Sequence, residues 1–251
     1  MAYLIENETA ENFLAARKSL EASLALDPHS AEAWGQLALV LIRGYVRNWN
    51  HARLDDVDRA EEAVAKAFAI NRSIALAHVA DGYIRQVKGD HLGALDAFDQ
   101  GIALSPNNAL ALAQKAQALV FLGRAKEAPP ALEKAITISP RDPDLGIFYF
   151  IMGQAYFAMG DYDNAIDWLQ KSVQLQPTLW FNRAWSISAY ALTGRLEQPD
   201  AQAALIEYRE KFKNWPLPKI RDWFSKTEPH PSPGCAATLQ ELFKGLRMAG
   251  V

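Results

Sequence analysis

The sequence predicts an all-α protein built from repeated helix pairs. Three observations predict it: a recurring closing motif, small and apolar residues at fixed offsets before that motif, and glycines between the paired helices. The motif begins at Leu26, Ile70, Leu104, Ile138 and Leu175, so the intervals are 44, 34, 34 and 37 residues. Self-similarity at such a period is typical of helical solenoids, whose units bury their apolar faces against one another.

Each copy of the repeat carries the same small and large residues. An apolar residue lies eight places before the third residue of the closing motif: Leu20, Val64, Phe98, Leu132 and Leu169. A small residue lies five places before it: Ser23, Ala67, Gly101, Ala135 and Ser172. An alanine precedes the apolar residue by four: Ala16, Ala60, Ala94, Ala128 and Ala165. Small residues let two helices approach closely while the large residue fills the space between them.

Turn glycines separate the two helices of a pair. Gly89, Gly123 and Gly160 lie five places before the alanine of their copies, and Gly194 holds the same place in a sixth copy. This order of small, apolar and closing residues resembles the tetratricopeptide repeat (TPR), over about residues 1–213. The resemblance implies a right-handed superhelix of five to six helix-turn-helix repeats.

The periodicity predicts helices in the following order. Their ranges are 9–26, 30–49, 55–70, 73–88, 91–104, 107–122, 124–138, 144–159, 161–175, 178–193 and 198–213. Ser73, Asn107, Asp161 and Thr178 are residue types that cap helix N-termini. The second copy holds about ten additional residues over 42–51, which a longer first helix and a wider turn would accommodate.

The chain ends outside the repeat pattern. Residues 214–218 read as a stiff connector, 219–225 as a short aromatic helix, and 229–234 as a loop. Residues 238–248 are amphipathic and predict a last helix. We therefore divide the chain into a TPR solenoid, 1–213, and a C-terminal capping segment, 214–251, because solenoids need polar caps at their ends.

The first copy lacks most of its first helix, since only residues 1–7 precede the second helix. Either the domain begins upstream or the chain was cut from a longer protein, and we favour the second reading. We expect residues 1–8 to be poorly anchored.

Composition limits the function classes. The net charge of −3 and pI of about 6.0 give no electrostatic footprint for nucleic acid. The single cysteine, Cys235, fits a reducing compartment and reads as a packed residue. The N-terminus has no signal-peptide pattern and no segment is apolar enough to span a bilayer, which predicts a cytoplasmic protein without membrane insertion.

No constellation of residues predicts catalysis, a metal site or a cofactor. The five histidines have no metal-ligand spacing, and His78 occupies a position where a packed ring is expected. Asp55, Asp56 and Asp58 either complement a helix dipole, which we favour, or form a cation site. Phosphate-binding and nucleophile-elbow motifs are missing from the sequence. We expect a non-enzymatic protein.

The tryptophans read mainly as packing residues. Trp34 occupies a core position, whereas Trp168, Trp180 and Trp185 pack between repeats or line the inner surface. Trp215 and Trp223 are expected to seal the tail against the last repeat.

In TPR proteins the first helix of each unit lines a concave groove that holds the ligand. Carried over by position, the resemblance implies a groove of aromatic, amide and small residues: Tyr83, Gln86, Gln117, Phe121, Phe150, Gln154, Phe157, Phe181, Ser188 and Ala191. No lysine or arginine at these positions could clamp a partner's C-terminal carboxylate. Two alternatives stay open: a groove for an extended or helical segment, or a groove that is shallow or filled by the protein's own tail. On the first, alanine at Phe150 and Phe157 leaves the fold intact and weakens partner capture.

A narrower resemblance concerns the ending of the chain. Residues 189–196, the Trp215-Pro216 pair and residues 239–251 resemble C-terminal repeat regions of bacterial multidomain regulators. There a nucleotide cyclase or winged-helix DNA-binding domain precedes the repeats. The leading hypothesis is a scaffold that binds a protein or peptide partner, or itself. The alternative is a regulatory region of a cyclase or transcription regulator whose output domain lies outside this chain.

Overall fold

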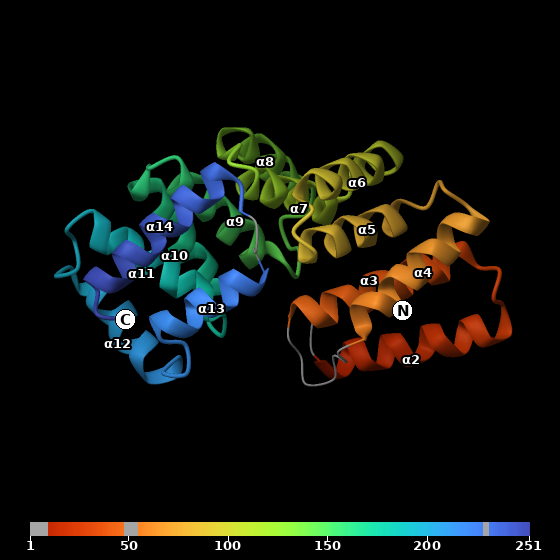
Figure 1. Cartoon of the computed structure of the whole chain (residues 1–251), viewed down its shortest axis with the longest axis horizontal. Coiled ribbons are helices and arrows are strands. Elements are labelled where there is room, and N and C mark those ends of the chain that lie inside the picture. Colours follow the sequence, from red (N-terminus) through yellow and green to blue (C-terminus); the bar gives the residue numbers. More distant parts are fainter. Residues whose placement is uncertain (1–9, 48–54, 228–230) are drawn as a thin grey trace. The chain divides into compact units, whose positions relative to one another are not determined.

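The computed structural model describes residues 10–47, 55–227 and 231–251 (Figure 1). Over these residues it contains thirteen α-helices, one short 3-10 helix and no strand. The all-α prediction is therefore confirmed. The expectation that residues 1–8 are poorly anchored falls outside the described residues. Among the described helices, none is long and apolar enough to cross a membrane.

The chain divides into two compact units, residues 1–115 and 116–251, with the boundary inside α7. The helices of the first unit are α2 (Ala10–Leu26), α3 (Ala31–Val46), α4 (Asp56–Ile70), α5 (Ala75–Val87), α6 (His91–Leu104) and the start of α7 (Ala109–Phe121). In this unit α3 pairs with α4 and α5 with α6, as the repeat pattern predicts.

The second unit contains the later repeats and the tail. Its helices after α7 are η1 (Ala125–Glu127), α8 (Ala128–Ile138), α9 (Leu145–Ala158), α10 (Tyr162–Leu175), α11 (Trp180–Leu192), α12 (Pro199–Lys211), α13 (Leu217–Thr227) and α14 (Pro233–Met248). The pairs are α9 with α10 and α11 with α12. The predicted capping segment, 214–251, belongs to this same compact unit.

The small residues of the repeat bring the paired helices into contact. The five alanines of the pattern are fully buried, and the large apolar residues of the pattern are at most 5% exposed. In the first unit a Cβ on Gly82 of α5 would lie 2.6 Å from Cδ1 of Phe98 on α6. In the second unit a Cβ on Gly153 of α9 would lie 2.6 Å from Cγ of Leu169 on α10. Both glycines therefore provide the space that a large residue of the partner helix fills.

Three of the turn glycines show why this residue recurs. Gly89, Gly123 and Gly160 have φ angles of 78°, 74° and 77°, which lie in the left-handed region. The turn after the first helix of each of these pairs thus needs a residue with a left-handed backbone conformation. Residues that have a Cβ adopt this conformation only at a cost in free energy.

The predicted helix bounds agree with the structure to within a few residues, except at two starts. The helix predicted from 124 begins as α8 at Ala128, after the 3-10 helix, since Pro129 and Pro130 are tolerated only in a first turn. The last helix, predicted from 238, begins at Pro233. The predicted lengthening in the second copy is confirmed for α3, which has 16 residues against 13 in α5. The rest of that insertion, 48–54, is outside the described residues.

The cap predictions were right for one position of four. Asp161 accepts a hydrogen bond from the Asn164 backbone N–H. Asn107 was wrong by one residue, because Asn108 accepts from the Ala111 N–H. Ser73 and Thr178 were wrong, because the helices begin one residue later, after Ile74 and Leu179, with no side-chain cap. A capping side chain is useful only at the residue that precedes the first helical turn.

A charged cluster joins α11 to α12. Arg183 is 2% exposed, and its guanidinium donates to the Glu207 carboxylate at 2.8 and 3.1 Å. It also donates to the Pro177 carbonyl, and Lys211 donates to the same carboxylate. The hydrogen bond from Lys211, together with the nearby Arg183 guanidinium, holds the pKa of Glu207 below its ordinary value.

The tail is fixed to the last pair by aromatic rings. Trp215 stacks on Trp180 of α11, with ring centroids 4.2 Å apart and planes at 12°. Trp223 of α13 meets the Trp180 ring edge-on at 5.7 Å. The interpretation that Trp215 and Trp223 seal the tail against the last repeat is confirmed.

We predict that Gly82→Ala lowers the urea midpoint of unfolding, because its Cβ overlaps the buried Phe98 ring; the cost is about 1–3 kcal/mol. Gly44→Ala is the matched control in the same unit. A Cβ there meets nothing within 4 Å, so we expect it to raise stability by about 0.5–1 kcal/mol through helix propensity. Equal effects of the two substitutions would contradict the packing argument.

We predict that Glu207→Gln lowers the free energy of unfolding by about 2 kcal/mol at pH 7, because it weakens the charge-assisted bonds of a buried arginine. The folded-state pKa of Glu207 is depressed, so its stabilisation is present above the ordinary value of about 4.3 and is lost as the pH falls through the folded-state value. Denaturation at pH 7 and at pH 3 should show the difference between variant and wild type shrinking. Glu210→Gln, exposed on the same helix, should have little effect at either pH.

Candidate interaction surface

The candidate surface lies in the second unit, where α14 packs along α11 and touches α9 (Figure 1). We call the face shared by α9 and α11 the inner face. These are the first helices of two successive pairs, so this is the face that the resemblance predicts as a groove. The apolar side of α14 is buried: Cys235, Leu239, Leu242 and Leu246 are at most 8% exposed. The tail of the chain thus covers part of this face, and the partner-binding groove stays a prediction.

The closest approach on the inner face joins Gly245 of α14 to Ser188 of α11. A Cβ on Gly245 would lie 2.5 Å from the Ser188 carbonyl oxygen and 2.8 Å from its Cα. The Ser188 hydroxyl donates to the Leu242 carbonyl at 3.0 Å, and Ser188 is fully buried. The two helices therefore cross with their backbones in near contact, which a larger residue at 245 does not allow.

The N-terminal end of α14 has its own contact with the unit. The Ser232 hydroxyl accepts from the Cys235 N–H as an N-cap and donates to the Phe121 carbonyl at 2.7 Å. Next to it, a Cβ on Gly234 would lie 2.6 Å from the Cα of Gly123. The glycine that turns the chain after α7 thus also receives the start of α14.

The C-terminal end of α14 is held from α12. Arg209 donates to the Ala249 carbonyl at 3.0 Å, just beyond the last residue of the helix. A cation there satisfies a helix carbonyl and complements the negative end of the helix dipole. On the side of α10, burial and then the nearby Glu241 carboxylate of α14 raise the pKa of the Tyr162 hydroxyl.

An aromatic layer joins α9 to α11. The ring of Phe150 lies 4.6 Å from that of Phe181, and the ring of Phe157 lies 4.9 Å from that of Trp185. Phe150 is 5% and Phe157 2% exposed. The expectation that these two rings face outward, so that alanine leaves the fold intact, is wrong. They pack between successive pairs, and removing two buried rings costs several kcal/mol.

The structure distributes the predicted groove residues over both units. Tyr83 and Gln86 lie on α5 of the first unit and are buried. The others belong to the second unit: Gln117, Phe121 and Phe181 are half-buried, and Phe150, Gln154, Phe157, Ser188 and Ala191 are buried. Ser188 directly contacts α14. A partner-binding role for the set stays a prediction.

Two polar groups of the inner face are buried without a hydrogen-bond partner among the described residues. They are Oε1 of Gln154 on α9 and Nε1 of Trp185 on α11. Trp185 lies one turn from Ser188, so the two share a face of α11. An unpaired buried donor or acceptor costs about 1–3 kcal/mol. These two atoms of the inner face form no hydrogen bond with any other described residue.

Sequence reasoning missed the residues that hold α14: Ser232, Gly234, Gly245 and Arg209. A signal was present for the first of them. Serine followed by proline is the pattern of an N-cap and a first helical position, and it would have moved the predicted start of the last helix to residue 233.

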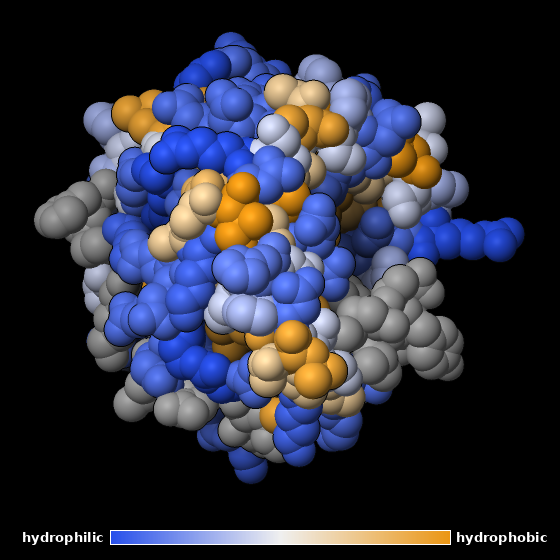
Figure 2. All heavy atoms as spheres, turned by 90° about the vertical axis from the view of Figure 1, so that its right-hand side faces the viewer, coloured by the Kyte–Doolittle hydropathy of each residue, from blue (hydrophilic) through white to orange (hydrophobic). Residues whose placement is uncertain are grey.

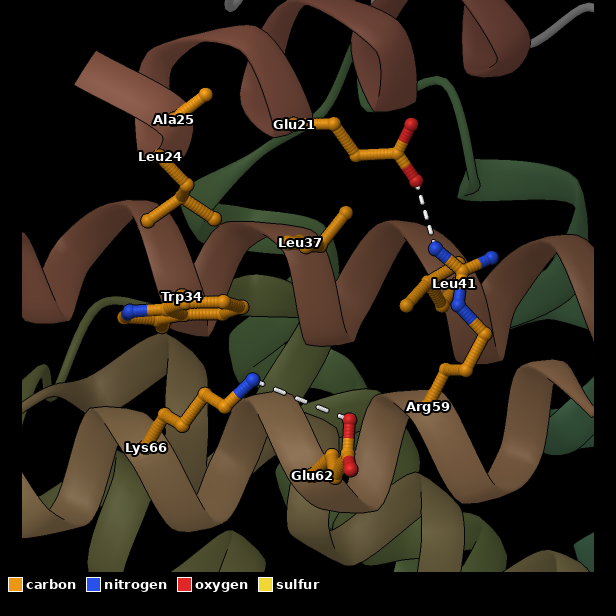
Figure 3. Close-up of a pocket in the computed structure, with 9 residues that line it drawn as sticks. All are labelled: Glu21, Leu24, Ala25, Trp34, Leu37, Leu41, Arg59, Glu62 and Lys66. Atoms are coloured by element: carbon orange, nitrogen blue, oxygen red, sulfur yellow. Dashed lines mark hydrogen bonds and ion pairs between the residues drawn. The ribbon is translucent and has the colours of Figure 1, made fainter. Parts of the chain in front are cut away.

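A hollow lies in the first unit, between α2, α3 and α4 (Figure 3). Its volume is about 310 Å³, and its lining includes Leu24, Leu37 and Trp34. Arg59 pairs with Glu21 at 2.7 Å, and Lys66 lies 3.9 Å from Glu62 and 4.4 Å from the centre of the Trp34 ring. The cations of its rim are thus engaged with neighbouring side chains.

The acidic run agrees with the favoured interpretation, because Asp56 and Asp58 lie in the first turn of α4, at the positive end of the helix dipole. Asp56 is 2% exposed, and its carboxylate accepts from Arg17 at 3.1 Å and from Arg59 at 3.4 Å. It is part of a network of ion pairs between α2 and α4. The described residues contain no group of three or more His, Cys, Asp or Glu side chains placed to hold a metal ion.

Two packing interpretations are confirmed. His78 is a half-buried ring whose Nε2 lies 2.9 Å from the Arg72 carbonyl and whose centroid is 4.6 Å from that of Phe68. Cys235 is buried on α14. Figure 2 shows hydrophobic side chains in small separate groups over the described part of the face in view, rather than in one broad patch.

Two segments of the chain match family models described as tetratricopeptide repeat. They are residues 82–143 and residues 147–179. A curated relative, the small glutamine-rich tetratricopeptide repeat-containing protein 2 of Mycosarcoma maydis, is 30% identical over 89 residues. That match covers 36% of this chain and only 24% of the relative.

Two solved structures share the fold. The PilF protein of Pseudomonas aeruginosa superposes with a TM-score of 0.60 at 18% identity, covering 85% of this chain and 92% of that one. YrrB, described as a TPR protein with an unusual peptide-binding site, has a TM-score of 0.51 at 19% identity and covers 77% and 92%. Residues 82–143 and 147–179 are therefore similar to tetratricopeptide repeats, and the chain shares the all-α solenoid fold of these structures.

Proposed function

We propose that this protein is a non-enzymatic interaction scaffold whose inner face binds a helical segment of a protein partner. The single observation that carries the proposal is α14, an amphipathic helix seated on α9 and α11 of its own chain. A surface that accommodates one helix by apolar burial and backbone contacts has the shape for another of the same kind.

The chemistry of the inner face supports a protein ligand. Large aromatic rings and the small Ser188 hydroxyl belong to the same face. The unpaired atoms of Gln154 and Trp185 can form directional hydrogen bonds with a ligand. Aromatic residues dominate binding energy at the buried centres of protein interfaces. The YrrB neighbour is itself described as peptide-binding, which agrees with the proposal. The regulatory alternative concerns an output domain outside these residues and stays a prediction, as does self-association.

The test is a displayed library of 16-residue helical peptides, selected on the wild-type chain. We expect enriched peptides to carry apolar residues three and four apart, and to bind at least about tenfold more weakly to Ser188→Leu, whose side chain fills the helix crossing. Lys171→Ala, exposed on α10, is the control that should leave affinity unchanged. Failure to enrich peptides, or equal binding to Ser188→Leu and wild type, would speak against the inner face as the binding surface.

A further inference from the structure

We propose that α14 is an exchangeable occupant of the inner face, and that a partner binds there by displacing it with its own amphipathic helix. This deepens the proposed function and rests on it. The helix that fits carries glycine where it crosses Ser188, leucines one turn before and directly after that glycine, and a neutral amide or hydroxyl side chain toward Gln154 and Trp185.

The contacts that hold α14 support exchange because the groups they engage are mostly backbone. Ser188 donates to the Leu242 carbonyl, and Arg209 donates to the Ala249 carbonyl. Carbonyls at these places are available on any helix that lies in the same position. At the crossing itself, the side-chain requirements are the absence of a Cβ and an apolar stripe beside it.

Two buried side chains of the inner face each have one polar atom without a hydrogen-bond partner in the described part of the chain. Gln154 is 3% and Trp185 2% exposed, yet Oε1 of the first and Nε1 of the second have no partner among the described residues. An acceptor and a donor on neighbouring helices would together be satisfied by a primary amide or a hydroxyl, which both donate and accept. A partner helix whose amide or hydroxyl side chain reached either atom would gain a hydrogen bond that the described residues do not make.

The pattern on α14 defines the partner more closely. Leu242 and Leu246 flank Gly245, and Leu239 lies a turn before Leu242. All three leucines are at most 8% exposed. A competing helix needs this spacing to bury comparable apolar area, since burial supplies most of the affinity. A strongly charged or proline-rich segment lacks it.

The first measurement is amide hydrogen exchange on the wild-type chain, which needs no partner. We expect the backbone amides of α14 to be at least about tenfold less protected than those of α9 and α11, because release opens α14 without unfolding the pairs. Protection of α14 equal to that of α9 and α11 would overturn the proposal.

The second measurement uses a labelled peptide of residues 232–251 added to the full chain. Gly245→Val should expel the chain's own α14, since its side chain meets the Ser188 backbone. We expect it to bind the peptide at least about tenfold more tightly than wild type does, because the face is vacated. Gly44→Val, where a Cβ meets nothing within 4 Å, is the matched control and should behave as wild type.

The outcomes separate this inference from the proposed function. A folded Gly245→Val chain that binds no peptide would show that α14 is not an exchangeable ligand. Loss of helical circular dichroism on Gly245→Val beyond that of the single 16-residue helix α14 would show that α14 is a permanent part of the core, and would equally overturn the proposal. If both measurements give the expected results but no library peptide is enriched, exchange of α14 is supported and binding of an external helical partner is contradicted.

Discussion

The close approach of helices at residues without large side chains is the constraint on which the rest of the structure depends. It operates within pairs, where Gly82 and Gly153 accept Phe98 and Leu169. The same constraint operates at the crossing of Gly245 with Ser188. In each case a missing Cβ lets backbone approach side chain or backbone, and the surrounding large residues fill the remaining space. Close approach at small residues thus operates both within the repeats and where the tail packs on them.

Much of the fold could be predicted because the small residues that permit close approach recur at fixed positions in the sequence. The alanines at 16, 60, 94, 128 and 165 recur at fixed offsets, and all are fully buried. Helix bounds followed from the same periodicity. Predictions failed where one residue decided the outcome: Asn108 rather than Asn107 caps α7, and Pro129 with Pro130 delays α8. Caps depend on the exact first turn, which hydrophobic periodicity determines only to within a few residues.

The candidate site was predictable in position and not in occupancy. The repeat register placed Gln154, Phe157 and Ser188 on the inner sides of first helices. It could not say that Phe157 packs against Trp185, or that Ser188 lies under α14, because both depend on long-range contacts. An amphipathic pattern shows that a helix will bury one side, but not against which surface. From the sequence alone, Gly245 could not be distinguished from the other residues of the tail. Its role depends on the Ser188 backbone, which lies far away in the sequence.

Occupancy by α14 changes how affinity on the inner face should be understood. A partner competes with a helix tethered to the same chain, so its apparent affinity is reduced by the fraction of molecules in which the face is open. If α14 is docked in about 99 of 100 molecules, the partner's dissociation constant rises about a hundredfold. Specificity then follows from the groups that α14 leaves unpaired, because apolar burial is similar for both helices and largely cancels in the exchange. A hydrogen bond to Gln154 or Trp185 that only the partner made would not cancel, and it would favour the partner helix.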